Sequence, residues 1–157
     1  QVFDVSAPSG PTRAWIDRLS RAFWPGPLTL VLPARGTPRI PALAGASTVA
    51  VRISSCPVAW LLTRAVGQPI TSTSANLSGS DPAASADAID ATLLGRIDLV
   101  LDGGAAPGGS PSTLLDLTGE RPSILRQGPV SAEEVAAVLG VHPRQNRIPD
   151  GIAPRAL

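Results

Sequence analysis

The stretch AFWPGPLTLVLP, residues 22–33, places the end of a helix directly before a strand. Upstream, apolar residues recur at helical spacing, so we expect an amphipathic helix over 12–24 with Thr12 as its cap. Proline lacks an amide hydrogen and disfavours helical backbone in the residue before it, so the helix must stop at residues 25–27. The apolar run LTLVLP then predicts a short strand over 28–33.

Short helix and strand signals continue to alternate along the rest of the chain. A proline- and glycine-rich loop is expected over 34–47. SAEEVAAVLG has capping-box spacing between Ser131 and Glu134 and a stop at Gly140. Further helices are predicted over 57–66, 85–97 (capped by Ser85) and 131–140. Further strands are predicted over 48–53, 68–74 (a strand running into a loop), 98–104, 112–119 and 123–128. The pattern predicts one mixed α/β domain over 1–141, followed by a linker or disordered tail over 142–157.

Composition excludes several classes of protein. The 157 residues are 43% hydrophobic, which suits one compact domain, and the net charge of +1 gives no general bias towards nucleic acid. No apolar run reaches the roughly 18 residues that a bilayer span needs, and no signal peptide is visible, so we expect a cytoplasmic protein without membrane contact. The chain begins with Gln rather than Met, so we expect its true N-terminus to lie further upstream.

The usual catalytic side chains are scarce. His142 is the only histidine and lies in the polar tail, so a Ser/His/Asp triad is not expected. Cys56 is the only cysteine, and we interpret it as a small buried residue. No HExxH or CxxC pattern exists, so a transition-metal site built by the protein is not expected. Asp102 and Asp116 follow strands and leave two interpretations open, an Mg²⁺ ligand or a solvated carboxylate.

Polar groups follow three predicted strands. Arg52 and Arg126 each come directly after apolar residues, where a buried guanidinium would need an anionic partner. The run ITSTSANLSG, residues 70–79, opens from a strand into a loop. Taken alone, such a run also fits a turn rich in side-chain-to-backbone bonds. Together the three strand ends favour a site for a small anionic ligand. WPGP, residues 24–27, is interpreted as a packing turn.

Six motifs then occur in an order that resembles a known family. They are AFWPGPLTLVLP, STVAVRI, PITSTSANLSG, LVLDGG, SPSTLLDL and ILRQGPVS. Over about residues 1 to 140 the chain resembles the YrdC/TsaC family, the threonylcarbamoyl-AMP synthases. The resemblance implies a YrdC-like twisted mixed sheet with flanking helices around a concave, positively charged cavity.

The resemblance also implies a reaction. L-threonine, bicarbonate and ATP, with Mg²⁺ accompanying the nucleotide, would give threonylcarbamoyl-AMP and pyrophosphate. A partner tRNA threonylcarbamoyltransferase would then use the adenylate to modify tRNA. By resemblance, Arg52 holds the threonine carboxylate and Arg126 contacts the nucleotide. The remaining implied roles are ATP binding by Thr48 and Ser74, threonine binding by Ser72 and Ser112, and loop shaping by Asn76 and Ser78. No catalytic residue is assigned.

The sequence departs from the family pattern at its start. The family carries an N-terminal segment with a TDT-YGL stretch and a Lys-x-Arg motif, and this chain contains no lysine. We therefore expect the N-terminal strands to be missing. Three alternatives to the synthase remain open: a truncated nucleotide-binding remnant without catalysis, a carbamoyltransferase-type YrdC-like domain, and a weak RNA-binding module.

Overall fold

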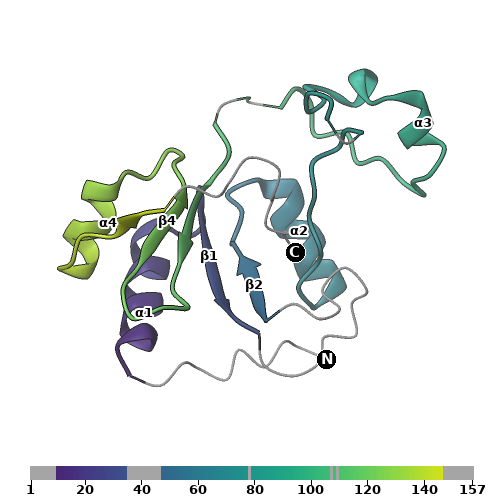
Figure 1. Ribbon diagram of the computed structural model, residues 1–157. Helices are drawn as coiled ribbons and strands as arrows, with labels where there is room; N and C mark the ends of the chain where they lie inside the picture. Colours follow the sequence, from purple (N-terminus) through teal and green to yellow (C-terminus); the bar gives the residue numbers. More distant parts are fainter. Residues whose placement is uncertain (1–9, 35–46, 78, 107, 109, 147–157) are drawn as a thin grey trace. The chain divides into compact units, whose positions relative to one another are not determined.

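The computed structural model describes residues 10–34, 47–77, 79–106, 108 and 110–146. The chain divides into two compact units, of which the first comprises residues 1–71 and 110–157 and the second residues 72–109. Figure 1 shows the elements of both units along the chain.

The first unit is built on a five-stranded mixed sheet in the order β2-β1-β3-β4-β5. The strands are β1 (Leu28–Pro33), β2 (Thr48–Val51), β3 (Thr113–Asp116), β4 (Ser123–Arg126) and β5 (Arg144–Gln145). β1 pairs antiparallel with β2 and parallel with β3, whereas β3 pairs antiparallel with β4. The expected α/β fold is confirmed. The short strand β5 pairs with β4 and extends the sheet into the segment that we expected to be a linker.

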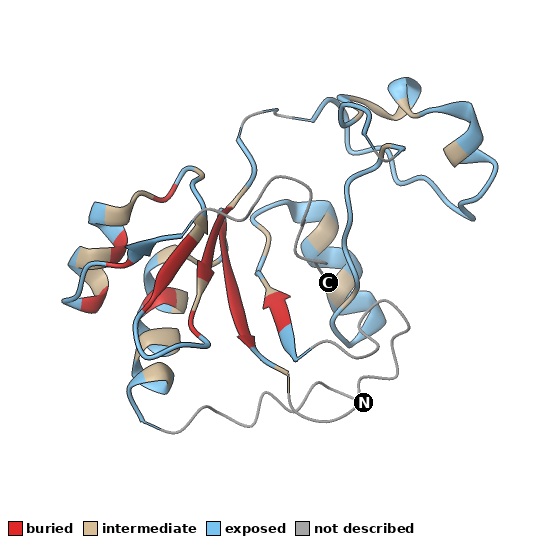
Figure 2. Ribbon diagram, in the orientation of Figure 1, coloured by how far each residue is buried: buried red, intermediate tan, exposed pale blue. Residues whose placement is uncertain are grey.

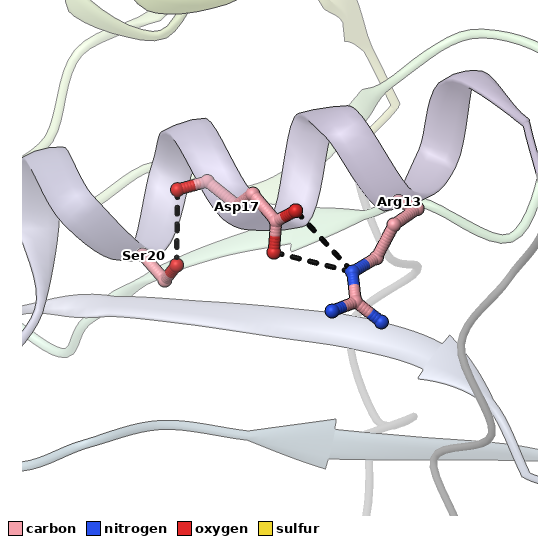
Figure 3. A network of polar contacts seen from close by, with 3 residues as sticks. All are labelled: Arg13, Asp17 and Ser20. Atoms are coloured by element: carbon pink, nitrogen blue, oxygen red, sulfur yellow. Dashed lines mark hydrogen bonds and ion pairs between the residues drawn. The ribbon is translucent and has the colours of Figure 1, made fainter.

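Helix α1 (Pro11–Phe23) ends at the predicted place but starts differently. Thr12 lies inside the helix and is not its cap. Gly10, at φ 83°, precedes the first turn, and Pro11 occupies the first helical position, where its missing amide hydrogen costs nothing. On the outer side of the helix, Arg13 and Asp17 form an exposed ion pair of 3.3 Å (Figure 3).

The turn between α1 and β1 is tightly packed. The indole Nε1 of Trp24 donates to the main-chain oxygen of Leu28 at 2.7 Å, and the ring packs against the core. A Cβ on Gly26 would lie 2.3 Å from the carbonyl oxygen of Phe23, so this position requires glycine. The interpretation of WPGP as a packing turn is confirmed.

One face of the sheet carries the main core, together with α1 and α4 (Ala132–Leu139) (Figures 1 and 2). The predicted capping box is present, because Ser131 accepts from the amide of Glu134 and Glu134 accepts from the amide of Ser131. Gly140 ends the helix at φ 74°. The buried residues of this core are Leu19, Leu28, Leu30, Leu32, Val49, Leu115, Leu117, Ile124, Val130, Val135 and Leu139.

Successive side chains of a strand point to opposite faces, so the alternate residues of the same strands lie on the other face. There Val31, Ala50 and Leu114 form a smaller buried cluster, against which Leu125 packs. This second face also carries Thr29 of β1.

Helix α2 (Pro57–Val66) has the predicted bounds. None of its residues is buried, and Trp60 and Leu61 are 44% and 60% exposed (Figure 2). The guanidinium of Arg64 lies 4.9 Å from the Trp60 ring centroid, a cation–π contact. Over the described residues, no helix combines the length and the apolar character that a membrane crossing requires.

The second unit differs from the prediction. The expected helix over 85–97 is split into a 3-10 turn, η2 (Ala86–Ala88), and the short helix α3 (Ala91–Leu94). Asp90, whose side chain accepts from the amide of Thr92, caps α3, whereas Ser85 makes no capping bond. The expected strands over 68–74 and 98–104 are absent from the described residues. A strand needs a hydrogen-bonded neighbour, and local sequence does not reveal whether one is present.

Candidate functional site

A polar row crosses the second face of the sheet in the first unit. Thr29 of β1 is paired with Leu114 of β3, and Leu114 is paired with Arg126 of β4. Arg52 directly follows Val51, the last residue of β2, which is paired with Leu30. The amide of Gly26 donates to the oxygen of Ile53 at 2.9 Å, so the segment after β2 stays next to the turn before β1. Ser112 contacts both Thr29 and Arg126, and the charge of Arg52 acts on Arg126 from nearby.

Arg126 is anchored to the residue before β3. Its Nε and Nη2 both donate to the main-chain oxygen of Ser112, at 3.2 and 3.0 Å, and Nη2 also lies 3.4 Å from the Ser112 hydroxyl. That hydroxyl lies 2.7 Å from the hydroxyl of Thr29. The predicted site residues Ser112 and Arg126 are therefore in contact, and Thr29 joins them.

A buried hydroxyl fixes the loop that follows β4. Thr113, which is 0% exposed, donates to the oxygen of Val130 at 2.7 Å and accepts from the amides of Gly128 and Val130 at 3.0 Å each. A Cβ on Gly128 would lie 2.3 Å from the oxygen of Pro111 and 2.4 Å from the amide nitrogen of Thr113. The loop thus packs directly on the backbone that carries Ser112.

The sequence reasoning missed Thr29, Thr113 and Gly128. Two signals pointed to Thr29 and Gly128: a lone hydroxyl within the apolar run LTLVLP, and a glycine followed by proline in RQGPV. Neither signal shows which distant segment the residue contacts.

The guanidinium groups of Arg52 and Arg126 give the candidate site positive charge. Partial burial lowers the pKa of Arg126 below its ordinary value, and the nearby charge of Arg52 lowers that pKa further. Across the residues that the structure describes, neither guanidinium is paired with a carboxylate, since the one ion pair joins Arg13 and Asp17. Two adjacent guanidinium groups without an acidic partner form a site suited to an anion with carboxylate or phosphate oxygens.

Thr48 lies at the other end of β2. It is exposed and paired with Pro33, four residues before Arg52. At the rise of an extended strand this separation is about 13 Å. A nucleotide rather than an amino acid would span that distance between Thr48 and Arg52.

The second unit holds the serine-rich loop. Ser72 and Ser74 are exposed, and Ser78 lies outside the described residues. Asn76 closes the loop, because its Nδ2 donates to the oxygens of Leu77 and Ser80 at 2.9 and 2.7 Å. Its Oδ1 is buried and has no partner among the described residues. Within this unit, a cavity of about 150 Å³ lies between the loop and the LDGG turn, with Ala75, Asp102 and Gly103 in its lining.

Asp102 and Asp116 are the two carboxylates that the sequence left open as Mg²⁺ ligands. Mg²⁺ prefers octahedral oxygen ligands and keeps several waters, and it is commonly held by carboxylates together with substrate phosphates. No group of three His, Cys, Asp or Glu side chains converges in the described part of the chain. Asp102 and Asp116 each accept a main-chain amide at 2.8 Å, from Gly104 and Thr118 respectively.

Cys56 is exposed and precedes α2, so the expectation that it is buried was wrong, because the segment of polar residues before Pro57 lies at the surface. His142 is exposed, and its main-chain oxygen accepts from Arg121 at 3.4 Å.

Comparison with known proteins gives a family match. Residues 5–128 match the Sua5/YciO/YrdC family, whose description reads "Telomere recombination". The chain is similar to the threonylcarbamoyl-AMP synthase of Bacillus subtilis, at 39% identity over 84% of this chain and 38% of that protein. It is similar to the Pyrococcus abyssi threonylcarbamoyl-AMP synthase, at 40% identity over 81% of this chain and 38% of that protein. A putative threonylcarbamoyl-AMP synthase of Mycobacterium tuberculosis is 42% identical over 78% of this chain and 56% of that protein.

Solved structures agree with this match. The structure of Pyrococcus abyssi Sua5 complexed with L-threonine has a TM-score of 0.74 and 35% identity, over 90% of this chain and 42% of that one. Escherichia coli YciO has a TM-score of 0.62 and 32% identity, over 75% of this chain and 58% of that one. The chain thus spans between about two fifths and three fifths of the length of these proteins.

Proposed function

Since the chain belongs to the Sua5/YciO/YrdC family, we propose that it carries part or all of an L-threonylcarbamoyladenylate synthase site. The proposed reaction joins L-threonine, bicarbonate and ATP into threonylcarbamoyl-AMP and pyrophosphate. The similarity to proteins named threonylcarbamoyl-AMP synthase supports it, as does the similarity to a structure with L-threonine bound.

The observation that carries the proposal is the pair Arg52 and Arg126. Arg52 follows β2 and Arg126 ends β4, and the two lie close enough for the charge of Arg52 to affect Arg126. L-threonine offers a carboxylate and ATP offers phosphates, and the planar fork of arginine matches the oxygens of both groups. Within the described residues the protein supplies no anion of its own to the two groups.

The proposed roles follow from this arrangement and from the family resemblance. Arg52 holds the threonine carboxylate, with Ser112 beside it, and Arg126 contacts the nucleotide. Thr48, about 13 Å along β2, would meet a distant part of the nucleotide. From the second unit, Ser72 is proposed to bind threonine and Ser74 to bind ATP, on a loop shaped by Asn76 and Ser78.

The chemistry requires no protein nucleophile. The threonine amine first attacks the carbon of bicarbonate, an N–C bond forms, and water leaves, which gives a carbamate. A carbamate oxygen then attacks the α-phosphorus of ATP, the bond from that phosphorus to the bridging oxygen breaks, and pyrophosphate leaves. The work left to the protein is to hold two anions together and to stabilise the charge on the leaving group. Guanidinium groups held by the main chain, as Arg126 is by Ser112, suit that task.

The remaining parts of the proposal concern the context of the reaction. Mg²⁺ would arrive with the phosphates of the nucleotide, and no step is assigned to it. We propose a cytoplasmic protein whose product passes to a tRNA threonylcarbamoyltransferase, with any RNA contact weak at a net charge of +1. Residues 1–141, with β5 (Arg144–Gln145) added to the sheet, would be the YrdC-like part, followed by a linker.

A direct assay tests the proposal. The chain is incubated with ATP, Mg²⁺ and bicarbonate, and pyrophosphate release is measured with and without L-threonine. Release that depends on threonine supports the synthase. ATP binding without release supports the alternative of a nucleotide-binding remnant. If neither ATP nor L-threonine binds, the site assignment is wrong.

A further inference from the structure

The contact between Thr29 and Ser112 joins two segments that are 83 residues apart, at 2.7 Å between their hydroxyl oxygens. Thr29 is 8% exposed and is the one polar residue in β1. Ser112 is half-buried and lies beside Arg126. The pair therefore stands at the anion site, with one hydroxyl inside the sheet and the other at its surface.

The direction of this hydrogen bond decides what Ser112 can offer a ligand. A hydroxyl has one hydrogen to donate and two lone pairs to accept with. A guanidinium can only donate, so the Ser112 oxygen accepts from Arg126. If Ser112 also gave its hydrogen to Thr29, it would have no donor left for an anion. If Thr29 is the donor, the hydrogen of Ser112 stays free.

Burial favours Thr29 as the donor. In the described part of the chain the Thr29 hydroxyl contacts no acceptor other than Ser112. Were Ser112 the donor, the hydrogen of Thr29 would be left buried without a partner, which is the more costly arrangement. Ser112 loses nothing by keeping its hydrogen free, because it is half-exposed and can donate to water or to a ligand.

We infer that Thr29 is a positioning residue, which donates to Ser112 and so turns the Ser112 O–H towards an anion held beside Arg52 and Arg126. Under the proposed function, on which this inference rests, that anion is the carboxylate of L-threonine. Thr29 itself does not touch the ligand. It acts by making Ser112 a hydrogen-bond donor rather than an acceptor.

The test compares two variants, of which one lacks and one keeps the hydroxyl at position 29. Thr29→Val keeps the shape of the side chain and suits a buried strand position, whereas Thr29→Ser keeps the hydroxyl. Binding of L-threonine and of ATP is measured by calorimetric titration, with circular dichroism to confirm folding. We expect Thr29→Val to raise the Kd of L-threonine about three- to tenfold, the range for one lost hydrogen bond, and the Kd of ATP less than twofold. Thr29→Ser should bind threonine like the unsubstituted chain.

A double-variant cycle separates positioning from general destabilisation. Added to Ser112→Ala, Thr29→Val should have no further effect on threonine binding, because there is then no hydroxyl to orient. If Thr29→Val does not fold, the pair Thr29→Ala and Thr29→Ser, which share the loss of the methyl group, decides by the same criteria.

Two kinds of result overturn the inference, and they are distinguishable. If the unsubstituted chain binds no L-threonine, the proposed function fails and the inference fails with it. If it binds L-threonine but Thr29→Val binds equally well, loses ATP to the same extent, or still weakens binding in the Ser112→Ala background, only the inference fails.

Discussion

Replacement of Thr113 by valine removes one buried hydroxyl that bonds to three main-chain groups. The side chain is 0% exposed, and Thr113→Val keeps its shape while losing the bonds to Gly128 and Val130. The oxygen of Val130 still accepts from Nε2 of Gln127 at 2.9 Å. Two amide hydrogens, those of Gly128 and Val130, are therefore left without a partner.

The size of the effect follows from those two groups. A buried amide without a partner costs about 1–3 kcal/mol, and the Gly128 amide is only part-buried, so we expect a loss of about 2–4 kcal/mol in the free energy of unfolding. Urea unfolding followed by circular dichroism measures it. With a slope of about 2 kcal/mol per molar urea, the midpoint should fall by about 1–2 M.

Thr113→Ser is the matched control, because it loses a methyl group but keeps the hydroxyl. Its free energy of unfolding should fall by about 1 kcal/mol. The free energy of unfolding of Thr113→Val is compared with that of the unsubstituted chain. If the two differ by less than about 0.5 kcal/mol, the rough size of a neutral surface change, the hydrogen bonds from Thr113 to Gly128 and Val130 contribute nothing to stability. Equal loss in Thr113→Val and Thr113→Ser would also refute the reasoning, since the methyl group would then explain both.

Two further predictions concern the same half of the fold. Gly128→Ala should lower the free energy of unfolding by about 1–3 kcal/mol, because the new Cβ would meet the main chain at 2.3 Å. Gly119→Ala is the control, since the nearest atom to its Cβ is 3.9 Å away. In the same urea assay its free energy of unfolding should stay within about 0.5 kcal/mol of the unsubstituted value. Equal effects at the two glycines would contradict the packing argument. Ser131→Ala should cost about 1 kcal/mol by removing the capping box, and Ser131→Thr should recover most of it in thermal melts. A melt of Ser131→Ala that matches the unsubstituted chain would show that the cap is redundant.

Elements with strong local signals were predictable from the sequence. The bounds of β1 and α2 are those expected, because prolines and glycines stand at their ends. The capping box at Ser131 was also predictable, since its two partners are only three residues apart. These features depend on neighbours along the chain.

Elements that depend on a distant partner were not predictable. The run DLVLDGG has the composition of a strand, yet no strand forms over 98–104 and Leu99 is 73% exposed. No strand of the described residues pairs with this run, and strand propensity without a neighbour does not make a strand.

The candidate site shows the same division. Arg52 and Arg126 stood out in the sequence as charges directly after apolar strands, and in the structure they lie near enough for the charge of Arg52 to lower the pKa of Arg126. Thr29 and Ser112 belong to the site only because β1 pairs in parallel with β3, a register that links residues 83 positions apart. Local sequence contains no signal for that register.

The central claim is that Arg52 and Arg126 form one anion site with separate tasks. Its most direct test is calorimetric titration of L-threonine and ATP into Arg52→Ala, Arg126→Ala and a control, Arg13→Ala. The control removes the same charge from the outer side of α1 (Figure 3). The account predicts that Arg52→Ala weakens L-threonine binding at least about tenfold and ATP binding less than about threefold, with the reverse for Arg126→Ala and no change for Arg13→Ala. Equal loss of both ligands in both site variants, or unchanged binding in both, would contradict it.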